Sequence, residues 1–163
     1  DGMDAVTLVE RQVKRFQDQV VPLWSEHHPQ HMTMFQMVTL ASMVEREAVV
    51  PKERPHIAGV LLHRLKDGMP LQCDATIQYA LGEQKAVLSL QDLKIDSPYN
   101  TYIHNGLPPG PIGNPGLSCL QAAMQPLKTA DLFYVRNDVK NNGSHVFAKT
   151  YAEHEENIKK YQR

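Results

Sequence analysis

The stretch that decides the fold is residues 33–49, TMFQMVTLASMVEREAV. Thr33 is a suitable N-cap residue and Pro51 a suitable stop, so we predict one helix that runs from Thr33 to about Val49. With about 100° per residue and Leu40 set at zero, the apolar side chains of residues 40–48 centre at about 30°. The sequence therefore predicts an amphipathic helix with one face buried.

Two glutamates near the end of this helix point in different directions. On the same wheel Glu47 falls at about 340°, inside the apolar face, and Glu45 falls at about 140°, at its flank. The two carboxylates are therefore not a catalytic pair. Burial raises the pKa of a carboxyl group, as a general acid needs near neutral pH, so Glu47 is the catalytic candidate and Glu45 the less favoured one. Two structural interpretations compete: Glu47 forms a salt bridge with Arg54 or Arg64, or the helix ends early and leaves Glu47 in solvent.

The remaining segments predict an α+β domain that is mostly helical and has one antiparallel β-hairpin. Its strands are residues 132–136 and 145–149, and Asn141-Asn142-Gly143 between them is a strong hairpin signal. Residues 97–116 predict a long loop whose last eleven residues hold four glycines and four prolines, and such loops often carry function. The predicted helices are 4–26 with a kink or end at Pro22, 53–66, 75–81 capped by Asp74, a turn at 90–94 capped by Ser89, 118 to about 126 opened by Ser118, and 150–161 capped by Thr150.

Length and composition exclude several classes of protein. The 163 residues predict one domain, and the formal charge of −1 argues against a nucleic-acid binder. No apolar run approaches the 18 or so residues of a membrane span. The eight histidines show no metal-binding spacing, even at His27, His28 and His31, and no phosphate-cradling motif is present, so we expect neither metal nor cofactor. Cys73 and Cys119 have no CxxC spacing, and two buried thiols are favoured over one disulfide.

A site that grips a polysaccharide needs polar and aromatic side chains, and the sequence offers a group of them around the long loop. Each has a structural alternative: Asp74 as a helix cap, Asn100 as a turn residue, and Tyr99 and Tyr102 as core residues. The candidate substrate-binding residues are Gln72, Asp74, Tyr99, Asn100, Thr101, Tyr102 and Asn114.

Several separated motifs resemble those of the YceG-like proteins, the endolytic murein transglycosylases. The resemblance covers about residues 35–160, and residues 1–34 form a less distinctive N-terminal helical part. It implies a lysozyme-like catalytic core at 35–163, and it aligns Glu47 with the family's catalytic position. The motifs are LASMVEREA at 40–48, GVLLHRL at 59–65, GMPLQCD at 68–74, SPYNTY at 97–102, GLPPGPI at 106–112, NPG at 114–116 and HVF at 145–147.

The resemblance also implies a reaction. Family members cut the bond between N-acetylmuramic acid and N-acetylglucosamine inside peptidoglycan strands and leave 1,6-anhydro ends. One glutamate acts as acid and then base, and the sugar's own 6-hydroxyl is the nucleophile. A hydrolase on the same scaffold and a non-catalytic peptidoglycan-binding module are the alternatives. One departure is His63, where the family usually has asparagine; a substrate contact there would add a titration near neutral pH.

The family's setting is a bacterial cell envelope. The resemblance implies a single-pass anchor in the inner membrane, with the catalytic part facing the periplasm or the outer wall space. The expected partners are glycan strands and the penicillin-binding proteins that synthesise them. Asp1-Gly2-Met3 predicts a piece of a longer chain, and the family's transmembrane helix and LysM-like module are absent from these 163 residues.

Overall fold

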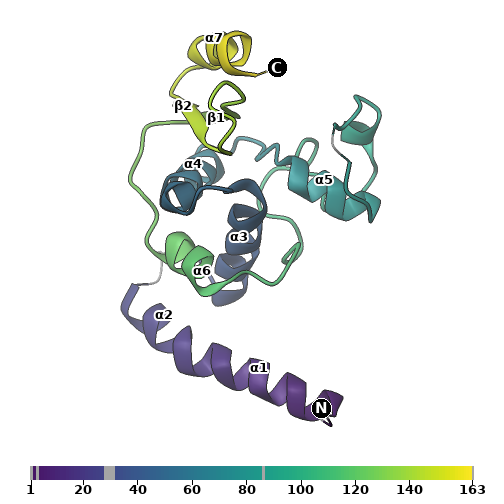
Figure 1. The fold of residues 1–163 in the computed structure, drawn as a ribbon, viewed down its shortest axis with the longest axis vertical. Helices are drawn as coiled ribbons and strands as arrows, with labels where there is room; N and C mark the ends of the chain where they lie inside the picture. The colour runs from purple at the N-terminus through teal and green to yellow at the C-terminus, as the bar shows by residue number, and fades with distance from the viewer. Residues whose placement is uncertain (1, 3, 28–31, 86, 163) are drawn as a thin grey trace.

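Helix α3, Met34–Glu47, lies at the centre of the molecule (Figure 1). Thr33 caps it in a reciprocal capping box with Gln36, which confirms the predicted start. Leu40 and Met43 are fully buried, as the amphipathic pattern requires. The helix ends two residues earlier than predicted because the backbone becomes extended at Ala48. The computed structural model describes residues 2, 4–27, 32–85 and 87–162.

The other elements surround α3. Helices α4 and α6 pack against it, α5 and η2 lie to one side, and the β-hairpin with α7 lies at the end opposite to α1 (Figure 1). From residue 95 to residue 116 the chain runs in turns and bends. In chain order the remaining elements are α1 (Ala5–Gln19), α2 (Val21–His27), η1 (Pro51–Glu53), α4 (Arg54–Lys66), α5 (Asp74–Leu81), η2 (Asp92–Lys94), α6 (Leu117–Met124), β1 (Phe133–Arg136), β2 (His145–Ala148) and α7 (Tyr151–Tyr161).

The N-terminal helix is divided, as Pro22 predicts. The break between α1 and α2 falls at Val20, and Pro22 occupies the first turn of α2, where its missing N–H removes no helical bond. Val20 and Phe16 pack on the core, whereas α1 projects from the body towards the N-terminus (Figure 1). Within the described residues, no helix is both long and apolar enough to cross a membrane.

The predicted β-hairpin is confirmed. Strand β1 pairs with β2 in antiparallel register, with Tyr134 opposite Phe147 and Arg136 opposite His145. Left-handed backbone at Asn141 (φ 47°) and Gly143 (φ 72°) turns the chain between the strands. Thr150 then caps α7 in a second capping box, as predicted.

Two capping predictions are wrong, and the prediction for the cysteines is confirmed. Asp74 does not cap α5: it is the first residue of the helix, and its carboxylate binds a tyrosine hydroxyl instead of the backbone. Ser118 does not open α6, because Gly116 is the N-cap and the Ser118 hydroxyl accepts a hydrogen bond from Arg54. Cys73 and Cys119 are both free and buried, which confirms the prediction of two buried thiols.

Candidate functional site

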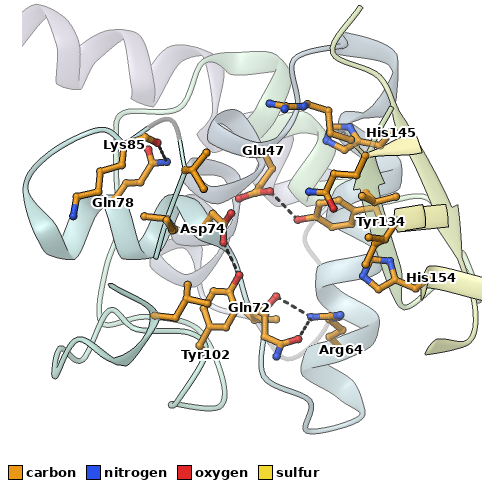
Figure 2. A pocket seen from close by; sticks show the side chains of 18 residues that line it. Glu47, Arg64, Gln72, Asp74, Gln78, Lys85, Tyr102, Tyr134, His145 and His154 are labelled. Carbon is orange, nitrogen blue, oxygen red and sulfur yellow. Dashed lines mark hydrogen bonds between the residues drawn. The ribbon is translucent and has the colours of Figure 1, made fainter. Parts of the chain in front are cut away.

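A cleft of about 860 Å³ opens between the end of α3, the start of α5 and the β-hairpin (Figure 2). Helix α7 adds part of one wall, and the chain around η2 adds part of the other. Of the predicted site residues, the cleft brings together Glu47, Gln72, Asp74 and Tyr102. These four come from three separate segments of the chain.

Glu47 is the last residue of α3, and its half-buried side chain points into the cleft (Figure 2). Its Oε2 accepts a hydrogen bond from the Tyr134 hydroxyl at 3.1 Å. Burial raises the pKa of Glu47 to about 7, and the negative charge of Asp74 acts in the same direction. The Tyr134 hydroxyl, the Ala75 backbone N–H and the Arg46 guanidinium lower that pKa but do not outweigh burial.

The structure does not contain the salt bridge that was considered between Glu47 and Arg54 or Arg64. Arg54 donates to the Ser118 hydroxyl, and Arg64 donates to backbone carbonyls and to Gln72. Among the described residues neither arginine pairs with Glu47. No cation in the described part of the chain pairs with the carboxyl group, so burial, assisted by the nearby Asp74 carboxylate, favours its protonated form.

Glu45 has a different environment. It is exposed and lies outside the cleft, and its Oε2 accepts a hydrogen bond from the backbone N–H of Gly116 at 2.5 Å. Gly116 is the N-cap of α6, so a carboxylate at this place complements the positive end of the helix dipole. The bond ties the end of α3 to the start of α6, which is a structural role.

The wall opposite Glu47 carries Asp74, Tyr102 and Gln72 (Figure 2). The Tyr102 hydroxyl donates to Oδ1 of Asp74 at 2.5 Å, and burial, followed by this carboxylate, raises the pKa of Tyr102. Gln72 has a left-handed backbone (φ 53°), and its Oε1 accepts from Arg64 at 3.3 Å. The Tyr102–Asp74 and Arg64–Gln72 hydrogen bonds hold these side chains in place. The wall therefore presents the oxygen atoms of Asp74 and Gln72 in defined positions.

The other predicted binding residues lie outside the cleft lining. Asn100 and Thr101 are buried, and they support the wall from behind: the Asn100 amide donates to two carbonyls, and the Thr101 hydroxyl accepts from the backbone N–H of Cys73. The Tyr99 ring packs against that of Tyr79, with centroids 4.7 Å apart. The side chain of the fourth, Asn114, is exposed.

His63 does not line the cleft either. Its Nδ1 lies 3.3 Å from the carbonyl oxygen of Asp131, and its Nε2 lies 3.4 Å from the Asp67 carboxylate. It therefore links α4 to the chain that enters β1.

Sequence reasoning missed the part of the site that the hairpin contributes. Tyr134 and His145 both line the cleft, and His145 Nδ1 lies 2.9 Å from a carboxylate oxygen of Glu53. The alternation of strand 132–136 could have put Tyr134 on one face, but it could not show that this face meets the end of α3. In the described part of the chain, no group of three or more histidine, cysteine or acidic side chains could hold a metal ion.

The chain is similar in sequence to a known protein family and to several known proteins. The model of the YceG-like family matches residues 1–160. An endolytic murein transglycosylase of Bacillus subtilis (strain 168) is 41% identical over 154 residues, which are 94% of this chain and 42% of the relative. One from Streptococcus pneumoniae serotype 2 is 31% identical over 157 residues, 93% of this chain and 28% of the relative.

A crystal structure of a yceG-like protein from Listeria monocytogenes has the same fold. Its TM-score is 0.82 at 37% sequence identity, over 94% of this chain and 49% of that one. The chain thus spans less than half the length of each of these relatives. From the family match and these similarities, this chain belongs to the YceG-like family.

Proposed function

We propose that this chain carries the catalytic site of an endolytic peptidoglycan lytic transglycosylase, with Glu47 as general acid and then general base. The observation that carries the proposal is the cleft-facing, half-buried Glu47 carboxyl, whose pKa is raised to about 7. A group with this pKa is both a usable acid and a usable base near neutral pH. The names of the relatives support the same activity.

The reaction needs one proton donor that becomes a proton acceptor. Protonated Glu47 gives its proton to the glycosidic oxygen as the bond from that oxygen to C1 of N-acetylmuramic acid breaks. The 6-hydroxyl of the same sugar then forms a bond to C1, and the Glu47 carboxylate removes the hydroxyl proton. The products are a 1,6-anhydro end and a free 4-hydroxyl on N-acetylglucosamine, and Glu47 is protonated again.

The fold assignment that accompanies this proposal is lysozyme-like. A glutamate at the end of a buried helix faces a cleft whose other side is a small β-hairpin, and an acid held in a partly apolar cleft suits glycoside cleavage. We assign residues 35–163 to the catalytic core and residues 1–34 to an N-terminal helical part of the same domain.

A hydrolase is the second candidate, and one observation favours it. Asp74 shares the cleft with Glu47, and a second carboxylate is what enzymes that add water or form a covalent intermediate use. Water would then take the place of the 6-hydroxyl, and the new ends would be reducing ends.

Mass spectrometry of digested sacculi separates the candidates. Purified sacculi are incubated with this chain, with Glu47→Gln and with Glu45→Gln as the matched control on the same helix. We expect anhydro-muramyl fragments from the wild type and from Glu45→Gln, and none from Glu47→Gln. Reducing-end fragments would support the hydrolase. Sacculus binding without any fragments, unchanged in Glu47→Gln, would support a binding module and contradict the proposal.

The cellular setting is also part of the proposal. We place the catalytic site on the periplasmic or outer-wall side of the bacterial inner membrane, held there by a single-pass anchor outside these 163 residues. Glycan strands are the proposed substrate, and the penicillin-binding proteins that synthesise them are the proposed partners. No nucleic acid or cofactor enters this function.

A further inference from the structure

The hairpin residue Tyr134 donates a side-chain hydrogen bond to Glu47, and the reaction as proposed above does not use it. Its hydroxyl donates to Oε2 of Glu47 at 3.1 Å across 87 positions of the sequence. Burial, followed by the nearby Glu47 charge, raises the pKa of Tyr134 well above 10, so the phenol keeps its proton while Glu47 titrates. The Tyr134 hydroxyl can therefore donate a hydrogen bond to Glu47 both when Glu47 is protonated and when it is ionised.

We propose that Tyr134 is the positioning residue of this site: its hydroxyl holds Oε2 of Glu47, so that Oε1 is the oxygen that gives up and takes back the proton. This inference rests on the proposed role of Glu47. A donor at Oε2 favours the carbonyl-like oxygen there, which leaves the acidic proton on Oε1. After the first step the same bond stabilises the carboxylate that has formed, because hydrogen bonds to charged acceptors are the stronger ones.

The surroundings of Tyr134 fix its ring. The His145 ring lies edge-on at 5.4 Å between centroids, and His145 is itself held by Glu53 at 2.9 Å. These two side chains are only 8% and 12% exposed. Phe147, opposite Tyr134 in the sheet, packs at 6.2 Å. The hydroxyl thus has little freedom to leave Glu47, as positioning requires.

Several other ionisable groups act on Glu47 or Tyr134, and any pH measurement must account for them. They are Arg46 from α3, Arg64 from α4, Asp74 from α5, Cys73 before α5, Tyr102 from the chain between η2 and α6, and His145 from β2. The Tyr134→Phe substitution leaves all of them in place, so the comparison with wild type isolates the hydroxyl.

The first test is the pH profile of cleavage by Tyr134→Phe. The hydroxyl lowers the pKa of Glu47, so its removal raises that pKa and moves the alkaline fall of kcat/KM to higher pH. On the plateau we expect kcat to fall by about 10- to 100-fold, which corresponds to the loss of one hydrogen bond to a charged group. Binding of soluble glycan strands to Glu47→Gln should not change when Tyr134→Phe is added.

The control is Tyr151→Phe, a tyrosine on α7 whose side chain is exposed and outside the cleft lining. It should keep both the rate and the position of the alkaline fall. A Tyr134→Phe variant with an unmoved profile and full activity would overturn the positioning role. An active Glu47→Gln would instead overturn the proposed function, so the two failures are distinguishable.

A second test does not depend on activity. With ¹³C at the side-chain carboxyl carbon of glutamate, the signal missing from Glu47→Gln identifies Glu47, and its midpoint should lie higher in Tyr134→Phe than in wild type. If Tyr134→Phe does not fold, ¹³C-labelled tyrosine in the wild type serves instead. The Tyr134 signal should then follow the titration of Glu47 and lose this response in Glu47→Gln. An unchanged midpoint, or a Tyr134 signal that ignores Glu47, would refute the inference.

Discussion

The raised pKa of Glu47 predicts that replacing it by glutamine stabilises the domain at alkaline pH but not at acid pH. In the folded state burial raises the pKa of Glu47 from 4.5 to about 7. The unfolded chain therefore releases this proton near pH 4.5, whereas the folded chain holds it to about pH 7. The contribution of Glu47 to stability is complete below pH 4.5, decreases between pH 4.5 and 7, and is lost above pH 7.

The magnitude follows from these two values. At about 1.4 kcal/mol for each tenfold change in acid dissociation, Glu47 lowers the free energy of unfolding by at most about 3 kcal/mol between pH 4 and pH 8. Glutamine fills the same space, still accepts from Tyr134 and carries no charge. Glu47→Gln should therefore match the wild type within about 1 kcal/mol at pH 4 and exceed it by about 2–3 kcal/mol at pH 8.

Urea denaturation followed by circular dichroism at the two pH values measures this difference. Glu45→Gln is the matched control because it removes an equal charge from the exposed side of α3. The expected result is a pH-dependent gain in Glu47→Gln beyond any change in Glu45→Gln. If Glu47→Gln differs from the wild type by the same amount at pH 4 and pH 8, the carboxyl is not held in a desolvated place, and the physical basis for its role as acid is lost.

Three further predictions concern the groups that shape the site. Asp74→Asn removes a negative charge that raises the pKa of Glu47, so the alkaline fall of the pH–activity profile should move to lower pH, the reverse of the effect of losing the tyrosine donor. Gly59→Ala would place a Cβ 2.2 Å from the carbonyl oxygen of Leu127, and thermal denaturation should show a loss of about 2 kcal/mol or more. Arg64→Met leaves three carbonyls without their guanidinium donor, and urea denaturation should show a loss of about 2–4 kcal/mol.

Local signals in the sequence were sufficient for the helices and the hairpin. The capping residues Thr33 and Thr150 satisfy free N–H groups of their own helices, so their effect does not depend on distant residues. The position of Glu47 on the apolar side of its helix also followed from helical geometry alone. Asp74 shows where local reasoning fails: its place before a helix matched a cap, but a tyrosine hydroxyl 28 positions away competes for its carboxylate.

The sequence by itself determined the elements, the family resemblance and which glutamate faces the interior. Only the tertiary structure decided which side chains surround that glutamate: Tyr134 reaches it from the hairpin and Asp74 from α5, while Asn100 and Thr101 turn inward to bind backbone groups. The physical reason is that a carboxyl pKa depends on desolvation and on charges within a few ångströms. Those distances are set by how the elements pack, and no local pattern in the chain encodes them.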